Sequence, residues 1–176
     1  AHNGNVTNAM ELKQELEDNG AIFTTTSDTE VICHIIVKER LKAKSAEEAI
    51  ANTMKVLKGA YSLVIMSPQK LIACRDPQGF RPLCMGKLGD DIIFASESCA
   101  LDICGAEFIR DIKPGEIVVV KDGKIVKEIS AEELEKECHA HIDSRYLEVE
   151  AIENAKEILG YAIQKCAAAH TSETTV

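Results

Sequence analysis

The sequence predicts an α+β fold in which antiparallel strands are flanked by helices. Apolar residues recur at helical spacing between residues 8 and 57, and from residue 60 onward they form short strand-length runs separated by turns. Helices followed by a series of short strands are typical of an α+β domain with a largely antiparallel sheet. Residues 131–169 return to helical spacing, which adds a C-terminal helical extension.

Polar caps indicate where the first helices begin. Ser27 and Ser45 are each followed by a glutamate three residues later, which is the spacing of a capping box. Asn8 and Glu11 form a variant of this pattern. Helices are therefore expected near residues 8–18, from residue 27 and from residue 45, and a β-like run at residues 21–25 separates the first two.

Most of the chain between residues 60 and 130 is predicted to be strand. Runs of strand length lie near residues 60–66, 71–74, 83–87, 92–96, 107–111, 116–121 and 124–129. Asp122 and Gly123 join the last two runs, and this dipeptide favours a two-residue hairpin turn.

Composition excludes several classes of protein. The 176 residues are 45% hydrophobic and 28% charged, an ordinary globular balance, and no apolar run is long enough to span a membrane. A net charge of −9 argues against nucleic acid as the main partner, because phosphate backbones favour basic surfaces. Seven cysteines at irregular spacing favour free thiols in a reducing, cytoplasmic setting.

Charge divides the chain into two parts. Residues 1–130 hold 16 basic and 19 acidic side chains, whereas residues 131–176 hold 4 basic and 10 acidic ones. We therefore expect one domain at 1–130 and an acidic helical extension of unknown role at 131–176. The sequence starts with Ala1 rather than methionine, so we expect it to be a piece of a longer protein.

Two short motifs could contact a substrate, although each has a purely local explanation. Asn3-Gly4 is an ordinary turn signal, yet an Asn amide and the next Gly N–H can also bind one developing oxyanion. Asp28 lies in the first turn of an expected helix, where an acid suits the helix dipole. Its carboxylate can also hold a substrate ammonium group.

Two longer motifs are more distinctive. RDPQGFRPL, at residues 75–83, has two prolines and a glycine that fix an unusual loop, and its simplest interpretation is a rigid connection held by an Arg–Asp pair. ASESCALD, at residues 95–102, runs from a strand end into a helical turn. Cys99 lies near that helix start, but no histidine is close to it in the sequence, so a catalytic thiol is not favoured there.

Together these segments resemble the glutaminase domain of class II glutamine amidotransferases, which are N-terminal-nucleophile hydrolases. AHNGNVTN, TTTSDTEV, LKGAYSLVIM, RDPQGFRPL, ASESCALD and IKPGEIVVV occur in that family's order. The match is most similar to the amidophosphoribosyltransferases, and glucosamine-6-phosphate synthase is the alternative. The resemblance implies a partial N-terminal-nucleophile hydrolase fold. It also implies, for the complete protein, conversion of phosphoribosyl diphosphate to phosphoribosylamine with glutamine-derived ammonia, in purine synthesis.

The resemblance implies roles for single residues. Asn3 and Gly4 match the oxyanion hole, and Asp28 matches the aspartate that binds the α-ammonium group of glutamine. Arg81 falls in the family loop and is a candidate substrate-binding residue without an assigned contact. The family's nucleophile is an N-terminal cysteine that none of the seven cysteines matches, so we expect no glutaminase activity from this chain alone. Mg²⁺, and in some relatives an iron–sulfur cluster, is expected only in the complete relative and no cofactor in this chain.

The extension, residues 131–176, has no counterpart in the resemblance. It contains three candidate metal ligands, but a zinc site would need a second ligand cluster that the sequence lacks: the three are Cys138, His139 and His141.

The leading strands of the family fold are not among the 176 residues. We therefore expect exposed sheet edges and a homo-oligomer. The alternatives are a non-catalytic interaction module and a truncated gene product without a function of its own.

Overall fold

The computed structural model describes residues 1–138, with side chains described as far as Leu134. Contacts divide the chain into two units, Ala1–Leu134 and Glu135–Val176, and all the candidate site residues lie in the first. Some expectations concern groups outside the described part, namely the Cys138 thiol, His139, His141 and the apolar stripe near the C-terminus.

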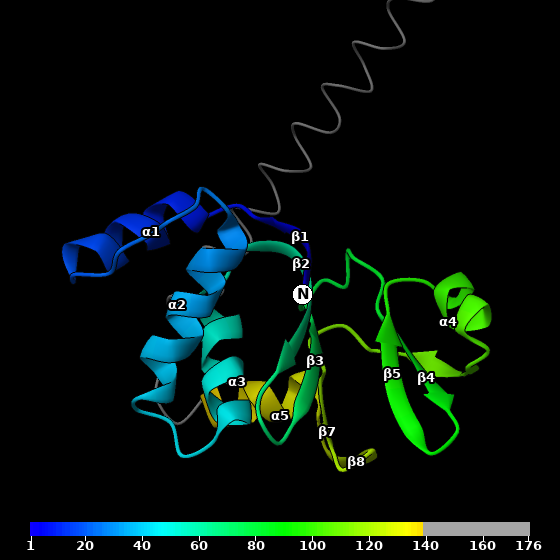
Figure 1. Ribbon diagram of the computed structural model, residues 1–176. Coiled ribbons are helices and arrows are strands. Elements are labelled where there is room, and N and C mark those ends of the chain that lie inside the picture. The colour runs from blue at the N-terminus through cyan, green and yellow to red at the C-terminus, as the bar shows by residue number, and fades with distance from the viewer. Residues whose placement is uncertain (139–176) are drawn as a thin grey trace, which may run out of the picture. The chain divides into compact units, whose positions relative to one another are not determined.

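The strands of the first unit form two antiparallel sheets (Figure 1). The five-stranded sheet has the order β1 (His2–Val6), β2 (Gly59–Met66), β3 (Leu71–Arg75), β7 (Ile117–Lys121) and β8 (Lys124–Ile129). The three-stranded sheet has the order β5 (Asp91–Ala95), β4 (Cys84–Leu88) and β6 (Glu107–Asp111). Asp122 and Gly123 both have positive φ, 51° and 74°, as the predicted hairpin turn requires.

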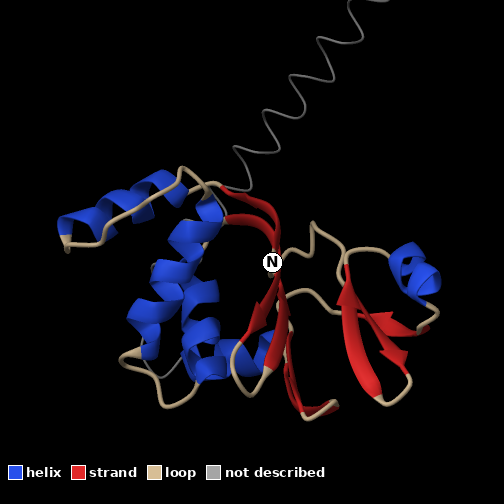
Figure 2. Cartoon of the chain, viewed as in Figure 1, coloured by secondary structure: helices blue, strands red, loops and turns tan. Residues whose placement is uncertain are grey.

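Helices cover the outer faces of both sheets (Figure 2). α2 (Asp28–Arg40) and α3 (Ala46–Val56) pack on one face of the five-stranded sheet, and the three-stranded sheet packs on its other face. α4 (Ser98–Cys104) covers the far side of the three-stranded sheet. The layers therefore run helix, sheet, sheet, helix. α1 (Ala9–Asp18) and the start of α5 (Ala131–Cys138) add apolar side chains to the first core.

Strands β3 and β7 show why the larger sheet lies in the middle. In β3, Ile72 and Cys74 face the helices, whereas Ala73 faces the second sheet. In β7, Ile117 faces the helices and Val118 faces the second sheet. Because successive side chains point to opposite faces, a strand covered on both faces needs an unbroken apolar run.

Two segments differ from their predicted structure. All the strands predicted between residues 60 and 130 are present, but the β-like run at residues 21–25 forms a loop. A carboxylate from α2 binds the backbone N–H groups of Thr24 and Thr25, so these groups do not need a strand partner. Conversely, residues 2–6, which contain the Asn-Gly turn signal, form β1, because five consecutive residues pair with β2.

The expected helix caps are also built differently. The Ser45 hydroxyl accepts from the Glu48 N–H at 3.2 Å, but the Glu48 carboxylate binds the residue before Ser45 instead of completing the box. Asn8 makes no cap with its side chain. Its amide instead bonds to the carbonyl of Val56 and the N–H of Lys58, both at 2.9 Å, and so fastens the end of α3 beside β1.

Candidate functional site

β1 is an edge strand among the described strands, and its outer backbone groups form the candidate site. Ala1 and Val64 exchange a pair of backbone hydrogen bonds, and the Thr7 N–H donates to the Lys58 carbonyl at 2.8 Å. The odd-numbered residues therefore bond to β2. Since an antiparallel ladder alternates, the even-numbered N–H groups, including that of Gly4, point away from β2.

Gly4 has no room for a side chain. Its φ is 149°, and a Cβ at this position would lie 2.0 Å from the carbonyl oxygen of Ala60. The backbone of β1 thus approaches β2 more closely than another residue would allow. The outward N–H of Gly4 is the kind of fixed backbone donor that an oxyanion hole uses.

Asp28 begins α2 and reaches the same strand edge. Its Oδ2 accepts a hydrogen bond from the Val6 N–H at 3.0 Å, and its Oδ1 lies 3.4 Å from Nδ1 of His2. Val6 is two residues beyond Gly4, a span of about 7 Å along an extended strand. The structure therefore brings Asp28 and the outward N–H of Gly4 to one edge.

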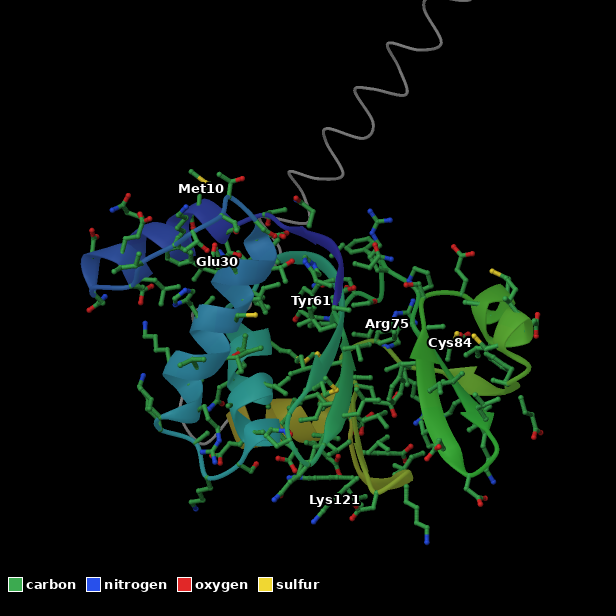
Figure 3. All side chains as sticks on the ribbon, in the orientation of Figure 1. Met10, Glu30, Tyr61, Arg75, Cys84 and Lys121 are labelled. Carbon is green, nitrogen blue, oxygen red and sulfur yellow. The ribbon has the colours of Figure 1, made fainter. Side chains whose placement is uncertain are left out.

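Glu30 fixes the loop that precedes Asp28 (Figure 3). Its carboxylate accepts from the hydroxyl and backbone N–H groups of both Thr24 and Thr25, at distances of 2.6 to 2.9 Å. These bonds lower the pKa of the Glu30 carboxyl to about 2, and the bond from the Thr25 hydroxyl contributes most. Only half of the predicted capping box forms, because Ser27 caps the helix while Glu30 binds the loop.

Asn3 points toward the second sheet. Its exposed side-chain amide donates to the Ser96 hydroxyl at 3.4 Å, a long and therefore weak bond. Ser96 belongs to the ASESCALD segment at the end of β5, so the structure places that segment next to the Asn3-Gly4 motif. A weakly held amide can turn to a ligand at little cost in free energy.

Sequence reasoning does not single out His2, which contacts the acidic residue of the site. Its side chain is only 3% exposed, and Nδ1 lies 3.0 Å from the Thr29 hydroxyl. Its Nε2 is buried and has no hydrogen-bond partner among the described residues. The available signal is that a histidine directly precedes Asn3 and Gly4.

Arg75 and Asp76 hold the RDPQGFRPL loop, but not by pairing with each other, so the predicted Arg–Asp pair is wrong. Arg75 donates at 2.6 to 2.8 Å to the carbonyl oxygens of Gly79, Arg81 and Ile112 (Figure 3). Asp76 is fully buried and accepts at 3.0 to 3.3 Å from the N–H groups of Tyr61, Gln78 and Phe80. Each charge binds peptide groups of complementary polarity, which fixes the loop backbone.

Arg81 is not brought into contact with the other candidate residues. Its side chain is exposed and makes no hydrogen bond or ion pair with the part of the chain that the structure describes. Its carbonyl accepts from the Ser62 hydroxyl at 3.1 Å, and Ser62 is the strand partner of Asn3. The loop backbone therefore lies beside Asn3, while the guanidinium group faces solvent.

The five cysteines with described side chains are free thiols. Burial raises the pKa of the Cys74 thiol to about 12, and burial likewise raises the pKa of Cys84. Cys99 is exposed near the start of α4, and its Sγ lies 3.6 Å from the Glu97 carboxylate, with no histidine or further base in contact among the described residues. None of these five has the surroundings of an activated nucleophile.

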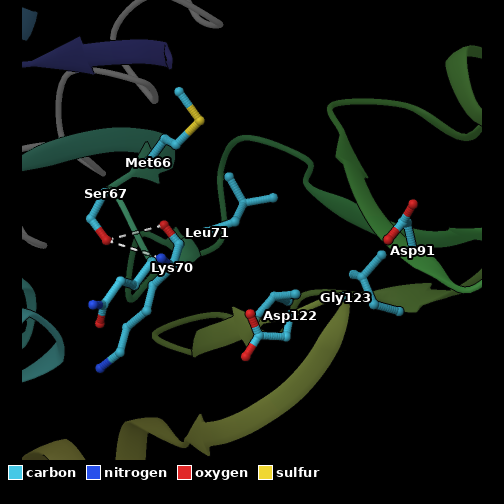
Figure 4. Close-up of a pocket in the computed structure, with 10 residues that line it drawn as sticks. Met66, Ser67, Lys70, Leu71, Asp91, Asp122 and Gly123 are labelled. Atoms are coloured by element: carbon cyan, nitrogen blue, oxygen red, sulfur yellow. Dashed lines mark hydrogen bonds between the residues drawn. The ribbon is translucent and has the colours of Figure 1, made fainter.

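Two open hollows lie on the described surface. One, of about 590 Å³, includes Ser96, Glu97 and Asp111 in its lining and adjoins Asn3 through Ser96. The other, of about 310 Å³, lies between the β2–β3 and β7–β8 turns, where the Ser67 hydroxyl bonds to the backbone of Lys70 (Figure 4). This second hollow contains none of the candidate residues.

Comparison with known proteins assigns the family. Residues 1–102 match the family described as a glutamine amidotransferase domain. The chain belongs to this family. An amidophosphoribosyltransferase from Methanocaldococcus jannaschii is 53% identical over 126 residues, which cover 72% of this chain and 27% of that protein. One from Bacillus subtilis is 46% identical over 122 residues, covering 69% of this chain and 25% of that protein.

Solved structures extend the likeness of this glutamine amidotransferase domain to its fold. A glutamine phosphoribosylpyrophosphate amidotransferase from B. subtilis, complexed with ADP and GMP, matches with a TM-score of 0.70 and 43% identity, over 74% of this chain and 28% of that one. The predicted N-terminal-nucleophile hydrolase fold is thereby confirmed. The chain spans about a quarter of the length of the curated relatives it matches.

Proposed function

We propose that residues 1–130 form part of the glutamine site of an amidophosphoribosyltransferase. In the complete protein, ammonia from glutamine would convert phosphoribosyl diphosphate to phosphoribosylamine in purine synthesis. The observation that carries this proposal is the shared strand edge, where the Asp28 carboxylate binds the Val6 N–H, two residues and about 7 Å along β1 from the outward N–H of Gly4. The names of the relatives agree with it.

The two ends of glutamine suit the two ends of this edge. Its side-chain amide and its α-ammonium group are separated by a short, flexible chain of carbons. The Gly4 N–H and the Asn3 amide would bind the amide oxygen as it gains negative charge, and Asp28 would accept hydrogen bonds from the ammonium group. Arg81 is kept as a candidate substrate-binding residue without an assigned contact.

Other parts of the complete protein would supply the remaining chemistry. The family resemblance implies a cysteine whose own α-amine acts as the base, and it attacks the amide carbon. Among the described side chains, no group of three or more His, Cys, Asp or Glu residues gathers to hold a metal ion. The family resemblance places Mg²⁺, and in some relatives an iron–sulfur cluster, in the rest of the complete protein.

The proposed setting is a cytoplasmic homo-oligomer that binds neither nucleic acid nor membrane. Among residues 1–138, no helix combines the length and apolar character needed to cross a bilayer. One plant relative, 49% identical over 125 residues, is named as chloroplastic, so related domains also work inside an organelle.

Kinetics of the complete gene product test the proposal. Asp28→Asn keeps an acceptor for the Val6 N–H but removes the negative charge, so the KM for glutamine should rise by about 10- to 100-fold. The rate with free ammonia in place of glutamine should stay unchanged. Asp18→Asn, at the exposed end of α1, is the matched control and should alter neither rate. An unchanged KM, or equal loss of both activities, would contradict the assignment.

A further inference from the structure

We propose that His2 is a positioning residue for glutamine binding, which acts by fixing the Asp28 carboxylate through its Nδ1–H. The inference rests on the proposed function and deepens it. The side chain of His2 is only 3% exposed, its Nδ1 lies 3.4 Å from Oδ1 of Asp28 and 3.0 Å from the Thr29 hydroxyl, and its Nε2 has no partner among the described residues.

The surroundings of the imidazole select one of its two neutral tautomers. With the proton on Nδ1, the ring donates toward a carboxylate oxygen and a hydroxyl, both of which accept. The buried Nε2 is then only an unused acceptor. With the proton on Nε2, the ring would bury an unpaired N–H and turn its Nδ1 lone pair toward the carboxylate. The first arrangement is the more stable, because a buried unpaired donor is expensive.

In this tautomer each oxygen of the Asp28 carboxylate has a donor nearby. Oδ2 accepts from the Val6 N–H, and Oδ1 faces Nδ1–H of His2. Each oxygen of an ionised carboxylate has two lone pairs, so one on each stays available for an ammonium group. A carboxylate fixed in this way binds its ligand without first having to be ordered.

Substitutions that imitate one ring nitrogen at a time test this role in the complete gene product. Asn places an amide N–H near the position of Nδ1, whereas Gln places one near Nε2. His2→Leu and His2→Gln should each raise the KM for glutamine by about tenfold while kcat stays within about twofold, because the contact is made before and during the reaction. His2→Asn should recover most of the affinity.

A ligand without the ammonium group separates positioning from general damage. 4-Carbamoylbutanoate is glutamine without its α-amino group, so its inhibition constant should be the same for the His2→Leu variant and the unaltered protein. His34→Leu is the control, since His34 lies on α2 against Phe23, with ring centroids 4.5 Å apart, and makes no contact with the site residues. The proposal would be overturned if His2→Leu weakened the binding of glutamine and of the analogue equally. It would also be overturned if His2→Asn and His2→Gln had the same KM for glutamine.

Nitrogen NMR of the unaltered chain gives a readout that needs no glutamine. The expected spectrum shows a protonated Nδ1 and an unprotonated Nε2 for His2. A protonated Nε2 in the neutral ring overturns the positioning role. A complete protein that fails to use glutamine, with the Nδ1–H tautomer present, contradicts the proposed function and leaves the tautomer of His2 established.

Discussion

The Asp28 carboxylate accepts a hydrogen bond from the Val6 backbone N–H at 3.0 Å and so ties the first turn of α2 to the outer edge of β1. Val6 is itself buried, at 4% exposure, which anchors this end of the strand in the core. The bond closes the edge at Val6, whereas the outward N–H of Gly4 stays open. One acidic side chain thus fastens an edge strand two residues from the outward N–H of Gly4.

Gly4→Ala should lower the rate of glutamine use sharply, through a backbone shift. Its Cβ would meet the Ala60 carbonyl oxygen at 2.0 Å, so β1 must move away from β2 and carry its outward N–H with it. Loss of one oxyanion donor lowers a rate by about 10²–10³. Steady-state glutamine hydrolysis by the complete gene product measures this. Gly89→Ala is the control. Gly89 also has a positive φ, but nothing lies within 4 Å of an added Cβ, so this variant should keep a rate near that of the unaltered protein.

Asp76→Ala should destabilise the domain by about 3 kcal/mol, because it leaves buried N–H groups without an acceptor. Asp76 accepts from Tyr61 in the core and from Gln78 and Phe80 in the loop. Asp76→Asn keeps one acceptor oxygen and should be intermediate. Urea unfolding gives these free energies. Asp90→Ala, in an exposed turn, should change the free energy of unfolding by no more than about 0.5 kcal/mol. An Asp76→Ala variant as stable as the Asp90→Ala control would rule out the inferred role of Asp76 as a buried acceptor.

Glu30 should make stability depend on pH below the ordinary range of a carboxyl group. Its pKa in the folded state is lowered from 4.5 to about 2, so its contribution is complete above pH 4.5 and is lost as the pH falls toward 2. Glu30→Gln should therefore unfold more easily than the unaltered chain at pH 7, and the difference should narrow between pH 4.5 and 2. Thermal melts across this range decide the point.

Arg110 should be needed to keep the two sheets together. From β6 it binds Glu116 with two hydrogen bonds, at 2.8 and 2.9 Å, and it also bonds to Glu128 of β8. Glu116 is only 5% exposed, so Arg110→Met would leave a buried charge unpaired and should cost about 3 kcal/mol of unfolding free energy. Adding Glu116→Leu to Arg110→Met should restore part of the lost unfolding free energy. If the two substitutions instead change the unfolding free energy additively in denaturant unfolding, the two residues are not coupled.

The purified 176-residue chain should not release glutamate from glutamine. The proposed oxyanion donors would be worth about 10²–10³ in rate, and none of the five described cysteines lies in an activating environment. Loss of the nucleophile of such a set costs about 10⁶. A coupled glutamate assay measures the outcome, with the complete gene product as the positive control. Measurable turnover by the chain itself would point to a nucleophile among its own residues.

Much of the fold could be predicted because it rests on local patterns. The apolar runs around Ile72 and Val118 predict strands by composition, and Ser45 predicts the start of α3. The loop at residues 21–25 and strand β1 could not be predicted in this way. Both depend on long-range partners: a carboxylate from α2 in the first case, and the backbone of β2 in the second.

The candidate site likewise combines residues that local motifs identify with contacts that only the fold creates. The motifs identify Asn3, Gly4 and Asp28, but no pattern shows that Val6 and His2 hold the Asp28 carboxylate, since these contacts join segments more than twenty residues apart. The motif around Arg81 is distinctive for a different reason than expected. Its charged residues shape the loop backbone, and the guanidinium group of Arg81 is left in solvent.

The placement of glutamine is tested most directly by a crystal structure of the complete gene product with glutamine bound. We expect the α-ammonium nitrogen within about 3 Å of the Asp28 carboxylate, and the amide oxygen between the Asn3 side chain and the Gly4 N–H. The Asn3 amide should then have left the Ser96 hydroxyl. Glutamine bound away from the outer edge of β1, with Asp28 still bonded to Val6 and beside His2, would contradict the proposed site.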